Sequence, residues 1–150
     1  MKILLIEDDD NKRKSIVSFL YEVLPQAIIL EASSYTTGVD YAMDEYVDFI
    51  LLDMSIPNFE GKDAFSSGEK LKNGGELILN ELLDEQVKFH CIIITQYETF
   101  NNESLTTIDN RLSKKCGDMY HGCIKYDTNN DNWKDSLKDK IYNVINSNSR

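Results

Sequence analysis

The chain has few of the residues that build disulfide-rich or zinc-binding proteins. It contains three cysteines, Cys91, Cys116 and Cys123, and two histidines, His90 and His121. The cysteines are odd in number and form no CxxC pair, so a disulfide framework is not indicated. His90 and Cys91 are consecutive on a predicted strand and point to opposite faces, which argues against a zinc site built from them. We therefore expect core thiols in a reducing compartment.

Positive charge and long apolar runs are also scarce. The sequence has 16 lysines and arginines against 26 acidic residues, which gives a formal net charge of -10. A field of this sign repels phosphate backbones and anionic lipids, so direct binding to nucleic acid or membrane is not expected. The apolar run at residues 1–6 ends in four acids and is too short for a signal peptide or a membrane span. These absences predict a cytoplasmic protein.

The chain does contain five apolar runs of strand length, each followed by a helical pattern. The runs cover residues 2–6, 27–30, 48–53, 87–95 and 119–125. Apolar residues at helical spacing cover residues 11–24, 33–46, 75–83, 104–116 and 133–145. This alternation predicts an α/β fold with a parallel sheet, right-handed crossovers and helices on both faces. We expect one domain over residues 1–146 and a frayed tail over residues 147–150.

One segment, residues 55–74, interrupts the alternation. It has no sustained apolar stripe, and its punctuating residues are Pro57, Gly61, Gly68 and Gly74. We therefore expect a long loop over the carboxyl edge of the sheet. Loops of this length are usually functional or disordered. Gly75 is then predicted to open the third helix.

Polar side chains stand at the carboxyl ends of four predicted strands. They are Glu7 and Asp8 after the first, Asp53 after the third, Thr95 after the fourth and Lys125 after the fifth. These ends meet at one edge, where open α/β sheets bind ligands. Crowded carboxylates repel unless a cation lies among them, and oxygen ligands suit Mg2+. A phosphoryl group would use the metal, the hydroxyl and the ammonium together, so the sequence predicts a phosphoryl site. Asp9 and Asp10 are expected in the first helical turn instead.

These residues resemble the receiver domains of two-component response regulators. Residues 3–9 are similar to that family's first strand and acidic pair, and Asp53 with Pro57 matches its phosphoacceptor and the proline that follows. Thr95 and Lys125 match its hydroxyl and lysine. The resemblance spans almost the whole chain and implies a flavodoxin-like (βα)5 doubly wound sheet with strand order 2-1-3-4-5.

The resemblance further implies a stand-alone receiver in which Asp53 takes a phosphoryl group from a histidine kinase or phosphotransfer protein. The Mg2+ ligands it implies are Glu7 through water, Asp8, Asp53 and the main-chain carbonyl of Ser55. Thr95 and Lys125 would contact the phosphate. Such a protein catalyses only its own phosphorylation and dephosphorylation. It would signal to a downstream protein by contact or onward phosphotransfer, as a monomer or weak dimer.

Three positions depart from the family's pattern. Tyr126 stands after the lysine where proline is usual, Gln96 replaces a small residue after the threonine, and Gly122 replaces an aromatic residue. They favour an alternative, a degenerate receiver that binds proteins without accepting phosphate. A third reading, a Mg2+-dependent phosphohydrolase, requires a second acid two residues beyond Asp53, where the chain has Ser55.

Overall fold

Five parallel strands form the central sheet of the computed structural model, which describes residues 1–58, 70–71, 73–97, 99–100 and 102–148. The strands are β1 (Lys2–Ile6), β2 (Ile28–Ala32), β3 (Phe49–Leu52), β6 (His90–Thr95) and β9 (Tyr120–Lys125). They lie in the order β2-β1-β3-β6-β9, which confirms the predicted 2-1-3-4-5 order of a flavodoxin-like sheet.

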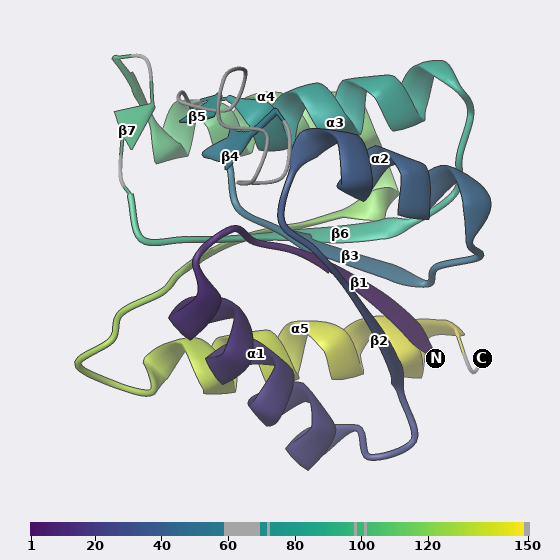
Figure 1. The fold of residues 1–150 in the computed structure, drawn as a ribbon, viewed down its shortest axis with the longest axis vertical. Coiled ribbons are helices and arrows are strands. Elements are labelled where there is room, and N and C mark those ends of the chain that lie inside the picture. The colour runs from purple at the N-terminus through teal and green to yellow at the C-terminus, as the bar shows by residue number, and fades with distance from the viewer. Residues whose placement is uncertain (59–69, 72, 98, 101, 149–150) are drawn as a thin grey trace.

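Helices cover both faces of this sheet (Figure 1). On one face lie α1 (Asp10–Val23) and α5 (Asn132–Asn148), and on the other lie α2 (Tyr35–Asp44), α3 (Gly74–Asp84) and α4 (Leu105–Cys116). A short 3-10 helix, η1 (Gly117–Met119), connects α4 to β9. The predicted α/β class is confirmed. In the described part of the chain, no helix is both long and apolar enough to cross a membrane.

Two short antiparallel hairpins stand outside the main sheet. One pairs β4 (Ile56–Pro57) with β5 (Lys70–Leu71), and the other pairs β7 (Thr99–Phe100) with β8 (Glu103–Ser104). The first hairpin lies within the loop predicted over residues 55–74, of which residues 59–69 and 72 lie outside the described residues. The sequence did not indicate either hairpin, because strands of two residues carry no periodicity.

Strand β3 is buried on both faces, as its uninterrupted apolar sequence predicts. Phe49 and Leu51 belong to the core under α1 and α5, whereas Ile50 and Leu52 belong to the core under α2, α3 and α4. All four side chains are at most 1% exposed. The strand therefore carries Asp53, the next residue, to the edge of a tightly packed layer.

The helices begin at capping residues that the sequence contains. Asp9 caps α1, and its Oδ1 accepts a 2.9 Å hydrogen bond from the amide of Lys12. Ser34 and Ser104 cap α2 and α4 through hydrogen bonds of 3.2 Å from amides three residues later. Asp10 lies in the first turn of α1. Asp10 thus occupies the first-turn position predicted for it, whereas Asp9, also predicted in the first turn, is the N-cap residue just before the helix.

The start of α3 lies directly against the end of β3. The amide of Gly75 donates a 2.9 Å hydrogen bond to the carbonyl of Met54. A Cβ atom on Gly75 would lie 2.4 Å from the main-chain oxygen of Asp53 and 3.0 Å from Cα of Met54. Only glycine permits this approach of the two backbones.

Replacing Gly75 by alanine should therefore destabilise the protein by about 2 kcal/mol, because backbone atoms must shift to admit the methyl group. Gly38→Ala is the matched control. Its Cβ would meet the side-chain end of Ile6 at 2.8 Å, which a rotamer change relieves. Chemical denaturation of the two variants measures the difference, and equal losses would contradict the backbone clash.

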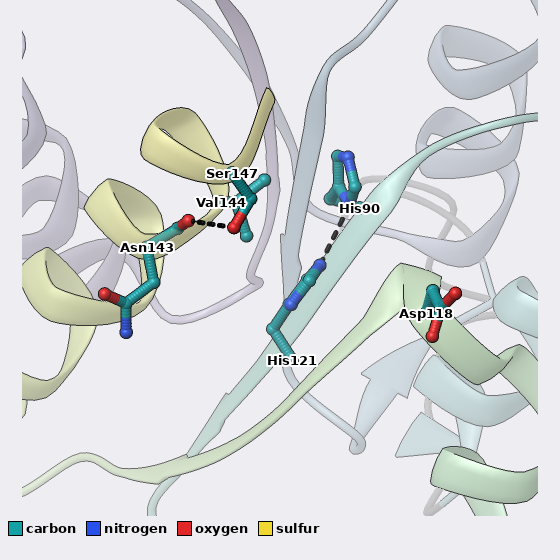
Figure 2. Close-up of a pocket in the computed structure, with 6 residues that line it drawn as sticks. All are labelled: His90, Asp118, His121, Asn143, Val144 and Ser147. Atoms are coloured by element: carbon teal, nitrogen blue, oxygen red, sulfur yellow. Dashed lines mark hydrogen bonds between the residues drawn. The ribbon is translucent and has the colours of Figure 1, made fainter. Parts of the chain in front are cut away.

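A histidine pair lies at the amino end of β6 and β9, opposite to the edge that carries Asp53. Nδ1 of His90 is 2.9 Å from Nε2 of His121. Figure 2 shows the two rings joined by this hydrogen bond. They line a pocket of about 360 Å³ together with Asp118, Asn143, Val144 and Ser147. Cys91 packs on the other face of the sheet, and the three cysteines are free thiols. This matches the opposite orientation predicted for His90 and Cys91.

His121 should make stability depend on pH. Burial lowers the pKa of His121, with further lowering by His90 and Lys140 and a smaller opposing effect of Asp118. The unfolded chain then binds a proton at His121 more readily, so the free energy of unfolding decreases as pH falls through about 6.5. Urea titrations between pH 8 and 5 should show a smaller decrease for His121→Asn than for the wild type. Parallel curves of unfolding free energy against pH for the two proteins would contradict an origin at His121.

Candidate functional site

The strand ends singled out by the sequence meet at one edge of the sheet, where β1 and β3 run side by side. Ile6 is the register partner of Leu52, so that Glu7 and Asp53 follow on neighbouring strands. Thr95 and Lys125 are register partners at the ends of β6 and β9. The edge lies at the left of Figure 1, away from the amino terminus. The predicted convergence is therefore present in the fold.

Asp53 is buried, with 4% of its surface exposed. Its Oδ1 accepts a 2.7 Å hydrogen bond from the amide of Met54. Its Oδ2 accepts a 2.9 Å hydrogen bond from Nζ of Lys12 on α1. Both carboxylate oxygens are thus held in fixed directions, one by the main chain and one by a cation.

Lys12 is the residue that sequence reasoning missed. Only 3% of it is exposed, although lysine is rarely buried without partners. Its Nζ lies 2.6 Å from Oε2 of Glu7, 2.9 Å from Oδ2 of Asp53 and 2.8 Å from the carbonyl oxygen of Ile94. The ammonium therefore lies between the two acids. A signal was present in the sequence, because Lys12 shares the apolar helical face of Ile16 and Phe19.

Glu7 is 1% exposed and supplies the second acid. Its Oε1 accepts a 3.1 Å hydrogen bond from the amide of Asp9. Burial raises the pKa of Glu7 to about 7, and the neighbouring ammonium of Lys12 offsets only part of this effect. Burial acts to lower the pKa of Lys12, but Asp53 and Glu7 raise it overall. Lys12 thus remains a cation in this cluster.

An aromatic side chain closes the site on the side of α1 and α5. The ring centroid of Tyr126 lies 5.6 Å from Nζ of Lys12, within range of a cation–π interaction. The same ring lies 5.1 Å from that of Trp133, which makes an edge contact with Phe19 at 5.5 Å. Tyr126 is 5% exposed. The residue that departs from the family's proline is therefore a wall of the lysine's pocket.

The hydroxyl and lysine predicted from the strand ends have different environments. Thr95 is fully buried, and its Oγ1 accepts a 3.3 Å hydrogen bond from the amide of Tyr97. Its carbonyl accepts a 2.8 Å bond from the amide of Tyr126, which ties β6 to β9 at this edge. Lys125 is exposed at the end of β9. The ammonium that hydrogen-bonds to the Asp53 carboxylate is that of Lys12.

The remaining predicted metal ligands, Asp8 and Ser55, are half-buried beside Glu7 and Asp53 in the chain. Carboxylate and carbonyl oxygens are the donors that Mg2+ prefers. Oε2 of Glu7 is buried and has no hydrogen bond of good geometry in the described part of the structure. However, no three His, Cys, Asp or Glu side chains among the described residues are grouped to hold a metal ion. The oxygen ligands are of the kind that Mg2+ prefers. The space between Glu7 and Asp53 is filled by the ammonium of Lys12, so the ion fits there only if this side chain moves away.

Comparisons with known proteins agree with this fold. No protein-family profile matches the chain. The Detocs response regulatory protein DtcB of Enterobacter cloacae (strain JD6301) is 27% identical over 148 residues, which cover 94% of this chain and 98% of the relative. A response regulator receiver domain protein from Clostridium thermocellum superposes with a TM-score of 0.63 at 23% identity, covering 99% and 96% of the two chains.

A third protein with this fold was solved with a bound metal. The response regulator TrrA from Thermotoga maritima, solved in complex with Mg2+-BeF, superposes with a TM-score of 0.59 at 20% identity and covers 93% of this chain and 97% of its own. This chain has the fold of response-regulator receiver domains, and its sequence is similar to that of a response regulatory protein over almost its whole length. It is homologous to DtcB.

The buried cluster predicts a large effect of removing the ammonium. Lys12→Met should lower the free energy of unfolding by about 3 kcal/mol, because two buried acids lose their shared cation. The exposed Lys14, two residues later on α1, is the matched control and should cost less than about 0.5 kcal/mol as Lys14→Met. Urea denaturation measures both losses.

The same cluster predicts non-additivity. The double variant of Lys12→Met with Asp53→Asn should lose less stability than the two single losses together, because the residues share one interaction. Additive losses would show that the ion pair contributes nothing to folding.

Proposed function

We propose that this receiver accepts a phosphoryl group on Asp53 from the phosphohistidine of a histidine kinase or phosphotransfer protein. The observation that carries the proposal is the placement of the Asp53 carboxylate. It is buried directly after the central strand β3, beside Glu7, which follows β1, and the neighbouring strand β6 ends in the buried Thr95. Receiver domains are signalling modules rather than enzymes, and the chain's fold agrees with that class.

In the proposed transfer, a carboxylate oxygen of Asp53 attacks the phosphorus atom of the donor. The new O–P bond forms as the P–N bond to the imidazole breaks, and the nitrogen keeps the electron pair and later takes a proton. At rest, Oδ1 accepts a hydrogen bond from the amide of Met54 and Oδ2 accepts one from the ammonium of Lys12. Thr95 and Lys125 are proposed to contact the transferred phosphoryl group.

Mg2+ belongs to the same proposal. Glu7, Asp8, Asp53 and the carbonyl of Ser55 would hold the ion after Lys12 withdraws, and the ion would supply positive charge for the transferring phosphoryl oxygens. The Mg2+-BeF complex of TrrA supports this assignment by analogy. The output is proposed to be contact with a downstream protein or onward phosphotransfer.

A second candidate function is protein binding without phosphorylation. The observation that favours it is the ammonium of Lys12, which lies between Glu7 and Asp53 and neutralises part of their charge. In this case the site would be a structural ion-pair cluster. Phosphorylation of the purified protein separates the two candidates.

The test is incubation with acetyl phosphate and Mg2+, followed by intact-mass measurement. The wild type should gain the mass of one phosphoryl group, and Asp53→Asn should gain none. Asp48→Asn is the matched control, because Asp48 is exposed at the opposite end of the same strand, where it accepts a hydrogen bond from the amide of Lys2. It should label like the wild type. A wild type that gains no phosphoryl group and does not bind beryllofluoride would favour the second candidate.

A further inference from the structure

The ammonium of Lys12 lies where the acids of the phosphoacceptor site converge. It hydrogen-bonds Oδ2 of Asp53 at 2.9 Å and the carbonyl of Ile94 at 2.8 Å, and it forms an ion pair with Glu7 at 2.6 Å. Lysine has three ammonium hydrogens, and three oxygens surround this one. The side chain is 3% exposed, so water contributes little to its solvation. The pocket is therefore built around a monovalent cation.

The oxygen that Lys12 occupies is the one a metal ion needs. Oδ1 of Asp53 is held at 2.7 Å by the amide of Met54, and Oδ2 is the carboxylate oxygen that shares the Lys12 ammonium with Glu7. A magnesium ion held by Oδ2 would lie close to the ammonium of Lys12, which is 2.9 Å from the same oxygen. Two cations so close in a buried site repel strongly, because the local dielectric is low. Mg2+ and the ammonium cannot both occupy the space between Glu7 and Asp53.

We propose that Lys12 is an internal competitor of Mg2+, which must withdraw from Asp53 before the site binds the metal. The inference rests on the proposed phosphoacceptor function and names its regulation. At rest, the ammonium neutralises one of the two acids and holds the receiver in a metal-free state. Any partner or ligand that draws Lys12 out of the pocket raises the affinity for Mg2+, since the two cations share the same oxygens.

Neighbouring residues hold Lys12 and its helical turn in a fixed position. Its main-chain amide bonds the cap residue Asp9, which fixes the first turn of α1. Arg13, the next residue, donates a 2.9 Å hydrogen bond to the carbonyl of Glu7, which ties the same turn to the end of β1. The ring of Tyr126 covers the ammonium at 5.6 Å from its centroid. Withdrawal of the side chain would change the environment of Tyr126 and of Trp133 behind it.

The test measures metal binding without phosphorylation. Isothermal titration with MgCl2 compares the wild type, Lys12→Met and Lys14→Met. Lys12→Met should bind Mg2+ at least about tenfold more tightly than the wild type, because it removes the competing charge and keeps an unbranched side chain. Lys14→Met removes the same charge from an exposed position on α1 and should match the wild type. Equal affinity of wild type and Lys12→Met would overturn the proposal.

Two further measurements cover the case in which Lys12→Met fails to fold. Lys12→Gln keeps hydrogen-bond donors and removes the charge, so it should show the same gain in affinity. In the wild type, acetylation mapped by peptide mass should show Lys12 protected relative to Lys14, and MgCl2 at saturating concentration should expose Lys12. Mg2+ that binds while Lys12 stays protected would also overturn the proposal.

This outcome is distinguishable from failure of the proposed function. If the wild type is not phosphorylated but Lys12→Met binds Mg2+ more tightly, the phosphoacceptor role is contradicted and the competition between Lys12 and Mg2+ is supported. Normal phosphorylation, with equal Mg2+ affinities of the wild type and Lys12→Met, would support the phosphoacceptor role and overturn the competition.

Discussion

A buried ammonium between two carboxylates is the constraint on which the carboxyl edge of the sheet depends. Taking a lysine out of water costs several kcal/mol unless its hydrogens find oxygen partners. Here the partners come from three strands, because Glu7 follows β1, Asp53 follows β3 and the carbonyl of Ile94 belongs to β6. A ring on the residue after β9 covers the fourth side. One side chain from α1 therefore holds four strand ends in a fixed relation.

Most of the fold could be predicted because it depends on apolar periodicity. The uninterrupted run in β3 indicated a strand buried on both faces, and the five alternations of strand and helix indicated the sheet order once the family resemblance was added. The cap residues Asp9 and Ser34 marked the starts of their helices through local hydrogen bonds. These signals are local or periodic, so neighbouring residues carry them.

The site was only partly predictable, since its decisive contact joins residues 41 positions apart. The strand-end rule located Glu7, Asp53 and Thr95, because parallel strands end at a common edge. It did not locate Lys12, which is on a helix and whose position in the chain suggests an ordinary surface lysine. Its place on the apolar face of α1 was the available signal. Tyr126, noted only as a departure from the family's proline, has a physical role beside Lys12.

The pairing of β4 with β5 has a consequence for how the sequence of this chain can vary. Ile56 pairs with Leu71 and Pro57 with Lys70, which joins the two ends of the segment between them shortly after Asp53. The entropy of closing such a segment grows only slowly with its length. Gly75 then returns the chain to the backbone of Met54. Sequence between the paired ends can lengthen or diversify while β3 and Asp53 keep their place, so new recognition surfaces can evolve there without a change in the sheet edge.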